Sequence, residues 1–144
     1  MSELTLNDLA TRMAKIDFAM LSTRSLNGKI AARPMSNNRD VQFDGDSYYF
    51  TLEKTHMVQE IEADPVVALT FTGSSQPDGA PPFFVAVEGR AELIREKPAM
   101  KSHWNEDIEK WFVEGFQTPG IVLIKVSAER IHYWAGEDEG ELTL

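Results

Sequence analysis

The segment Phe83–Arg95, FFVAVEGRAELIR, is the clearest strand in the sequence and the best guide to the fold. Its residues alternate between two sides. One side is small or apolar and holds Val85, Val87, Gly89, Ala91 and Leu93, and the other holds Ala86, Glu88, Arg90 and Glu92. A period of two with one apolar side is typical of a strand that buries one face, as antiparallel sheets do.

Other strand candidates lie on both sides of this segment. Asn27-Gly28 and Asp44-Gly45 are tight-turn signals, the first joining strands at 17–24 and 29–38, the second joining 41–43 to 48–52. Further strands are expected at 66–72 and 121–126, with 131–134 as a candidate continuation. The first half therefore indicates a helix followed by an antiparallel meander. Strands in hairpin order, about six or seven in all, predict a mainly β fold closed into a barrel with short peripheral helices.

Three helical segments are predicted between these strands. Thr5 and Asp8 form a capping-box pattern ahead of a helix at 6–16. Thr55 can cap a second helix at 56–63, which Asp64-Pro65 ends. The third, at 96–116, is helical in one or two pieces and carries an aromatic stripe of Trp104, Ile108, Trp111 and Phe112. Such a stripe is typical of a core or a subunit interface, and stacking on a flavin is the alternative for any one side chain.

Composition limits the function classes. The 144 residues are expected to form a single domain spanning 1–144, and the net charge of −9 without a basic run disfavours binding to nucleic acid or to an anionic membrane. The absence of cysteine excludes thiol catalysis and cysteine-ligated metals. No signal peptide and no membrane-spanning apolar run is recognised, so a cytoplasmic location is expected.

No side-chain catalytic machinery is predicted. His56, His103 and His132 lack the spacing of a metal site, and the sequence contains no nucleophile elbow, P-loop or dinucleotide-binding glycine motif. We therefore expect no catalytic residue and no metal ligand, and look for a binding site instead.

Two short stretches are candidates for binding an anion. Arg33-Pro34-Met35-Ser36 lies on a predicted strand, where an arginine can hold a phosphate bidentately and the proline indicates an edge or a close ligand approach. The alternative is an ordinary surface arginine beside an edge proline. Thr55 and His56 begin a helix, whose N-terminus is a natural phosphate site, although a plain capping threonine explains the same pattern. One hairpin separates the two stretches, so Arg33 and Thr55 can converge on one anion.

Taken together, these motifs resemble a known family. Arg33-Pro34-Met35, Phe50-Thr51 and the pattern Thr55-x-x-Val58-x-x-Ile61-x-x-Asp64-Pro65-x-Val67 resemble the FMN-binding segment of the pyridoxamine 5′-phosphate oxidase-like split barrels. The stretch from Trp104 to Trp134 is similar to the C-terminal half of the general stress protein branch. The resemblance runs from about Leu9 to Trp134, and the order and spacing of the motifs carry it rather than any single one.

The resemblance implies a split barrel that forms a homodimer with two FMN sites at the subunit interface. It assigns the FMN phosphate to Arg33, and the flavin ring and ribityl chain to the main chain of Pro34, Met35 and Ser36. Phe50 and Thr51 would lie on the next strand, and Thr55, His56 and Met57 fall where the family places phosphate contacts. FAD is the alternative flavin, and haem and deazaflavin are bound by other proteins of this fold.

The sequence departs from the family pattern at two places. Met57 stands where the family commonly has a phosphate-binding Lys, and losing a charge-assisted contact costs about 1.5–3 kcal/mol; the nearby Lys54 is a candidate replacement. The sequence up to Leu144 also lacks the Arg-containing segment that helps true pyridoxamine-phosphate oxidases hold their substrate, so that activity is not expected.

The sequence is therefore compatible with three functions. The first is an FMN-dependent oxidoreductase with a role in the general stress response, whose reductant and acceptor the sequence does not identify. The second is a non-catalytic module that binds or stores a flavin or another cofactor. The third is a cofactor-free dimer.

Overall fold

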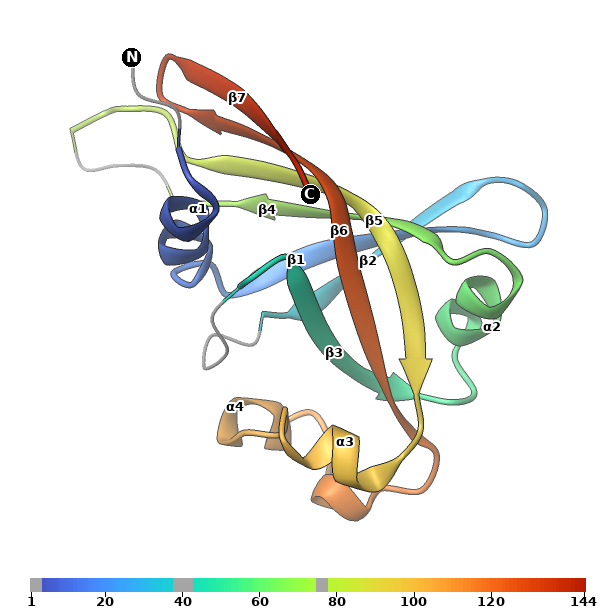
Figure 1. Cartoon of the computed structure of the whole chain (residues 1–144). Helices are drawn as coiled ribbons and strands as arrows, with labels where there is room; N and C mark the ends of the chain where they lie inside the picture. The colour runs from blue at the N-terminus through green and yellow to red at the C-terminus, as the bar shows by residue number, and fades with distance from the viewer. Residues whose placement is uncertain (1–3, 38–42, 75–77) are drawn as a thin grey trace.

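The computed structural model describes residues 4–37, 43–74 and 78–144. They form seven antiparallel strands with a few short helices between them (Figure 1). In chain order the elements are α1 (Leu6–Met13), β1 (Phe18–Arg24), β2 (Ile30–Ser36), β3 (Asp46–Leu52), α2 (His56–Ala63), β4 (Val66–Thr72), β5 (Phe84–Ile94), α3 (Lys97–Lys101), α4 (Glu106–Glu109), the 3₁₀ turn η1 (Gly115–Gln117), β6 (Ile121–Ala135) and β7 (Asp138–Thr143). The predicted mainly β fold with short peripheral helices is confirmed.

One curved sheet runs in the order β2-β1-β4-β5-β6-β3, with β7 added to the far end of β6. The predicted β1–β2 hairpin is present, and Gly28 in its turn has a φ of +83°. The predicted meander is wrong beyond this hairpin, because β3 pairs with β6, Tyr49 opposite Ile124, and not with β2. The strand expected at 41–43 lies mostly outside the described residues, and Phe43 belongs to no strand. A local turn signal carries no information about so distant a partner.

The two longest strands, β5 and β6, lie side by side in the sheet. β5 matches the predicted strand at 83–95, and β6 joins the two segments expected at 121–126 and 131–134 into one. The pairing shifts register between Glu88 and Gly89, where a bulge bends the pair. A Cβ on Gly89 would lie 2.4 Å from the Ser127 carbonyl oxygen, so the strands can approach this closely only because residue 89 is glycine.

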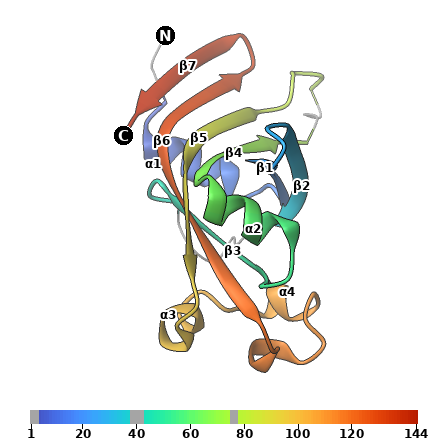
Figure 2. The same ribbon diagram turned by 90° about the vertical axis from the view of Figure 1, so that its right-hand side faces the viewer.

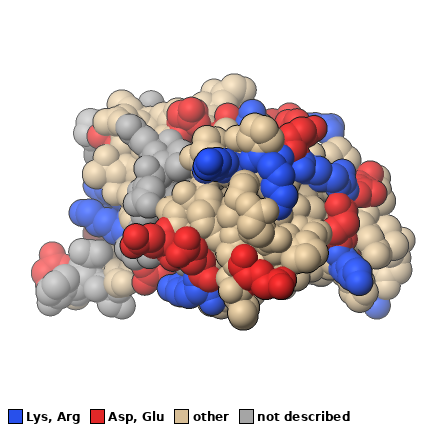
Figure 3. Space-filling model, turned by 90° about the horizontal axis from the view of Figure 1, so that it is seen from below, with Lys and Arg blue, Asp and Glu red and all other residues tan. Residues whose placement is uncertain are grey.

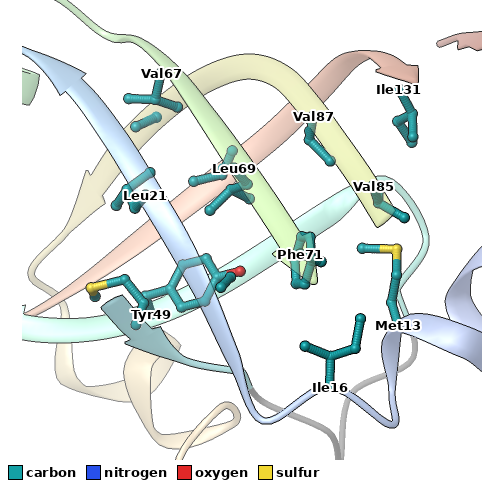
Figure 4. Close-up of a cluster of buried hydrophobic side chains, with 14 of the residues drawn as sticks. Met13, Ile16, Leu21, Tyr49, Val67, Leu69, Phe71, Val85, Val87 and Ile131 are labelled. Atoms are coloured by element: carbon teal, nitrogen blue, oxygen red, sulfur yellow. The ribbon is translucent and has the colours of Figure 1, made fainter. Parts of the chain in front are cut away.

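The barrel interior is filled by side chains from both halves of the chain. Figure 4 shows Leu21, Leu69 and Val87 side by side on the neighbouring strands β1, β4 and β5, with their side chains in the core. Helix α1 adds Leu9 and Met13, and its predicted capping box is present, with the Thr5 hydroxyl accepting from the Asp8 N–H at 3.1 Å. The helix ends at Met13, three residues earlier than predicted.

A second, smaller apolar cluster lies at the end of the sheet where β5 ends and β6 begins (Figure 1). The predicted helix at 96–116 is here divided into α3, α4 and η1, because Asn105 caps a new helix by accepting from the Ile108 N–H at 3.2 Å. Met100 and Leu123 are buried in this cluster, against Trp104 and Phe116. Among the described residues, no helix is long and apolar enough to cross a bilayer.

Candidate functional site

A cleft of about 500 Å³ is formed mainly by the two edge strands of the sheet, β2 and β3. It collects side chains or backbone from β2, β3 and α2, which are separated in the sequence. All nine residues predicted to bind a cofactor line it: Arg33, Pro34, Met35, Ser36, Phe50, Thr51, Thr55, His56 and Met57. Arg33 and Thr55 therefore line one cleft, although β2 and β3 do not pair with each other.

Arg33 is held in place by several hydrogen bonds. Its Nη1 donates to the Thr23 hydroxyl at 2.8 Å and to the Leu21 carbonyl at 3.3 Å, and its Nη2 donates to Glu60 Oε1 at 3.0 Å. The side chain is only 23% exposed. An ordinary surface arginine would be solvated and mobile, so this geometry favours a positioned guanidinium at one side of the cleft.

Thr23, Arg33 and Glu60 form a closed network, here called the polar triad. The Thr23 hydroxyl donates to Glu60 Oε1 at 2.6 Å while accepting from Arg33. Thr23 is buried, and the Glu60 side chain is 9% exposed. Buried charges require partners and hydrogen bonds, and this arrangement supplies both.

Thr23 and Glu60 were not predicted from the sequence as site residues. The signal for Glu60 was a carboxylate on the apolar side of helix α2, where it shares the buried face with Met57 and Ile61 at helical spacing. Helix α2 packs against β1 and β5, which brings that face to the barrel (Figure 2). Thr23 gave no comparable signal, because threonine is common in strands.

The three predicted phosphate contacts at the start of α2 differ in what they offer. The Thr55 hydroxyl caps the helix, accepting from the Val58 N–H at 3.3 Å and donating to the Leu52 carbonyl at 3.0 Å. His56 is exposed. Met57 is 5% exposed and belongs to the barrel core. The family's lysine position is thus occupied by a core side chain.

A third group of residues completes the cleft from a distant part of the chain. The cleft is also lined by Ile108, Trp111 and Phe112, here called the aromatic wall, which lie outside the predicted binding motifs. Trp111 is 56% exposed and makes an edge contact with Phe18, their ring centres 6.3 Å apart. Trp104, the fourth residue of the predicted aromatic stripe, does not line the cleft. It packs edge-on against Phe50 in the second apolar cluster, with the ring centres 5.1 Å apart.

Little positive charge faces the cleft. Within the described ranges, Arg33 is the sole Lys or Arg that lines it, and Lys54 lies outside its lining. The face seen from below in Figure 3 mixes acidic and basic side chains around uncharged surface. Tyr49 also lines the cleft, but its side chain belongs to the barrel core, where burial raises the pKa of its hydroxyl and keeps the phenol neutral. No group of three or more metal-ligating side chains occurs in the part of the chain that the structure describes.

An antiparallel sheet whose two edge strands part around an apolar cleft with one positioned arginine defines a split barrel. The family model for pyridoxamine 5′-phosphate oxidase-like proteins matches residues 5–144, and the chain belongs to this family. No curated protein sequence matches the chain.

Solved structures share this fold at low sequence identity. A protein related to general stress protein 26, from Clostridium acetobutylicum, is 16% identical with a TM-score of 0.78, over 96% of this chain and 94% of that one. General stress protein 26 from Bacillus anthracis is 24% identical with a TM-score of 0.72, over 93% and 94%. A heme binding protein from Mycobacterium smegmatis is 13% identical with a TM-score of 0.78, over 99% of this chain and 60% of that one.

Proposed function

We propose that the cleft binds a flavin, with FMN as the first candidate and FAD as the alternative, and that the protein is a flavin-dependent oxidoreductase of the general stress response. The observation that carries the proposal is the convergence of all nine predicted residues on one cleft. Its volume falls within the range of about 300–1,000 Å³ that is usual for small-molecule sites. Fold likeness to general stress protein 26 from Bacillus anthracis and to a related protein from Clostridium acetobutylicum supports the stress role.

The cleft offers different contacts to the ring, the ribityl chain and the phosphate of a flavin. Trp111, Phe112 and Phe50 offer flat apolar surface to a ring system. Arg33 would hold the phosphate, and the main chain of edge strand β2 would run along the ring and ribityl chain, where Pro34 leaves one fewer donor. Met57 supplies no charge, so phosphate binding would depend on Arg33.

The bound flavin would supply the redox chemistry, which needs no acid or base from the protein. The chain's own part would be to bind and orient the ring and to exclude water from it. Thr51, a buried residue that lines the cleft, would hydrogen-bond a polar edge of the ring.

A second copy of the chain would complete the site. Phe18, Leu52 and Trp111 line the cleft and are exposed large apolar side chains, and Met20 is exposed on the neighbouring surface of β1. Contiguous exposed apolar surface of this kind is typical of an interface. Sedimentation velocity should find a homodimer that Met20→Asp dissociates, whereas a monomeric wild type would contradict this part of the proposal.

Haem is the second candidate, favoured by the exposed His56 imidazole at the cleft, since histidine is a common axial ligand. The absorbance spectrum separates the two cofactors. A Soret band that His56→Ala abolishes would favour haem, and the yellow absorbance of a bound flavin would exclude it.

The test is a titration with FMN followed by flavin fluorescence. Wild type should bind saturably, in the micromolar range or tighter. Arg33→Ala should bind FMN more weakly by about one to two decades, as the loss of a charged hydrogen bond implies. The matched control is Arg24→Ala, which removes an exposed arginine of β1 whose partner is Asp64 at 3.4 Å, and should bind as wild type does.

Arg33→Ala also affects stability, because it leaves the Glu60 carboxylate buried without its partner. The double variant Arg33→Met, Glu60→Met replaces the pair by apolar side chains of similar size, a change that is often neutral for stability. It should bind FMN more weakly by up to about tenfold, because the guanidinium donors are lost without a change in net charge. Wild-type FMN affinity in both this variant and Arg33→Ala would exclude Arg33 from the phosphate site.

A further inference from the structure

We propose that Glu60 is a specificity-determining residue that neutralises Arg33 and so makes the cleft nearly indifferent to the charge of its ligand. Stated for the flavins, the wild-type cleft would bind FMN and uncharged riboflavin with similar affinity. The inference rests on the proposed function, because it concerns how the same cleft selects among flavins.

The first support is the geometry of the polar triad. A single carboxylate oxygen, Glu60 Oε1, accepts from Arg33 at 3.0 Å and from Thr23 at 2.6 Å. The Thr23 hydroxyl has one proton, and because that proton is given to Glu60, its oxygen is left to accept from Arg33. The bonds fix one another, so the negative charge is fixed beside the guanidinium.

The second support is burial. The side chains of Glu60 and Arg33 are 9% and 23% exposed, so water screens their charges much less than it screens those of a surface pair. An anion placed against Arg33 would feel both charges of the pair. The repulsion by Glu60 would offset much of the attraction by Arg33.

The third support is that Arg33 keeps donors for a ligand even so. A guanidinium has five N–H groups. In the described structure, Nη1 and one hydrogen of Nη2 are used by the protein, while the Nε–H and the second Nη2 hydrogen have no protein acceptor. The cleft can therefore hydrogen-bond a polar group here, but without net positive charge to favour a phosphate.

The fourth support is the lack of compensation. Within the described residues no other Lys or Arg lines the cleft, and Met57 lies in the core. The charge selectivity of the cleft thus depends on the carboxylate of Glu60 beside Arg33. Glu60 acts through Arg33, as a positioning residue that also sets the local charge.

The experiment compares the dissociation constants of FMN and riboflavin, measured by fluorescence on the full chain. In wild type the two should agree within about tenfold. Glu60→Gln keeps an oxygen that accepts from Thr23 and Arg33 but removes the charge. It should tighten FMN by about tenfold or more and leave riboflavin unchanged, with FMN binding more sensitive to salt. Glu60→Met, which removes the charge and the hydrogen bond, should shift the ratio in the same direction.

The matched control is Glu62→Gln. Glu62 lies on the same helix, but it is exposed and paired with Arg95 at 2.5 Å. The ratio of the two constants should stay at its wild-type value, because this charge lies in solvent outside the cleft lining. A loss of structure would change both ligands alike and would not change the ratio.

The outcomes separate the two proposals. If both flavins bind and Glu60→Gln leaves their ratio unchanged, the role of Glu60 is wrong and the flavin site stands. A wild-type preference for FMN above about a hundredfold would equally overturn the role of Glu60. If neither flavin binds wild type, the proposed function fails, and the inference fails with it.

Discussion

The polar triad and the aromatic wall reach the same cleft in different ways: of the triad only Arg33 belongs to the cleft lining, whereas all three wall residues line it. The triad is largely buried, and hydrogen bonds join its residues from β1, β2 and α2. The wall comes from residues 108–112, and its Trp111 is more than half exposed. A buried polar network is expected to contribute to both fold stability and ligand binding, as is the buried Ile108, whereas the exposed Trp111 of the wall is expected to contribute mainly to binding. Fold stability and ligand affinity are therefore expected to depend in part on different residues of the site.

Removing the carboxylate of the triad should have the largest effect. Glu60→Ala leaves Arg33 and Thr23 without their shared acceptor, and breaking a buried pair costs about 3 kcal/mol or more. We expect a fall of that size in the free energy of unfolding, measured in urea. Glu62→Ala, on the same helix but exposed, should lose less than about 1 kcal/mol. Equal losses in the two variants would show that the triad contributes no special stability.

Placing a lysine at the family position should come next. Met57 belongs to the core, so Met57→Lys should lower the free energy of unfolding by about 2 kcal/mol, because the ammonium must leave that core. Since residue 57 also lines the cleft, the ammonium can turn toward it and tighten FMN relative to riboflavin. A variant with full stability and unchanged selectivity would mean that the side chain at 57 reaches solvent elsewhere.

Shortening the aromatic wall should alter affinity without altering stability. Trp111→Ala should weaken FMN and riboflavin by the same factor, about tenfold, because the lost contact is with the ring. In the Met20→Asp background, where no second copy covers Trp111, the melting temperature should barely change, since the side chain is largely exposed in the single chain. Val113→Ala, at a fully exposed neighbouring position, is the control. A large drop in melting temperature for Trp111→Ala would contradict the division between the two groups.

The smallest expected effect concerns His103, which stacks on the cleft residue Tyr48 with ring centres 3.7 Å apart. Burial, and then the charge of Lys125, lowers the pKa of His103. A histidine whose pKa is lowered by folding binds its proton more readily when unfolded, so stability falls as the pH drops below about 6.5. His103→Gln should make the free energy of unfolding less dependent on pH between pH 7 and 5. An unchanged pH dependence would exclude this contribution.

The sequence predicted well what depends on neighbouring residues. The alternation in β5, the Asn27-Gly28 hairpin and the capping box of α1 are local patterns, and the structure contains all three. The partner of β3 was mispredicted because pairing with β6 joins segments more than seventy residues apart. The segment at 96–116 was expected to be more continuous than it is, because packing of Trp104 and Phe116 on β3 and β6 competes with helical periodicity.

The candidate site was likewise predicted where its residues belong to local patterns and missed where they do not. The nine residues of the recognised motifs all reach the cleft, since they lie at the ends of strands and of a helix whose order is local. Glu60 and Thr23 were missed because a carboxylate and a hydroxyl reveal a buried role only when their partners are known. The aromatic wall was seen as a stripe, but its division between the core and the cleft depends on where the chain turns at Asn105.

The central claim is that the cleft binds a flavin through its ring, and a titration of the wild-type protein with riboflavin tests it most directly. Riboflavin has the ring but no phosphate, so its binding does not depend on the charge balance at Arg33. We predict saturable quenching of flavin fluorescence in the micromolar range, with one flavin per chain and weaker binding in Trp111→Ala. No saturable binding of riboflavin, or binding that Trp111→Ala leaves unchanged, would contradict the account.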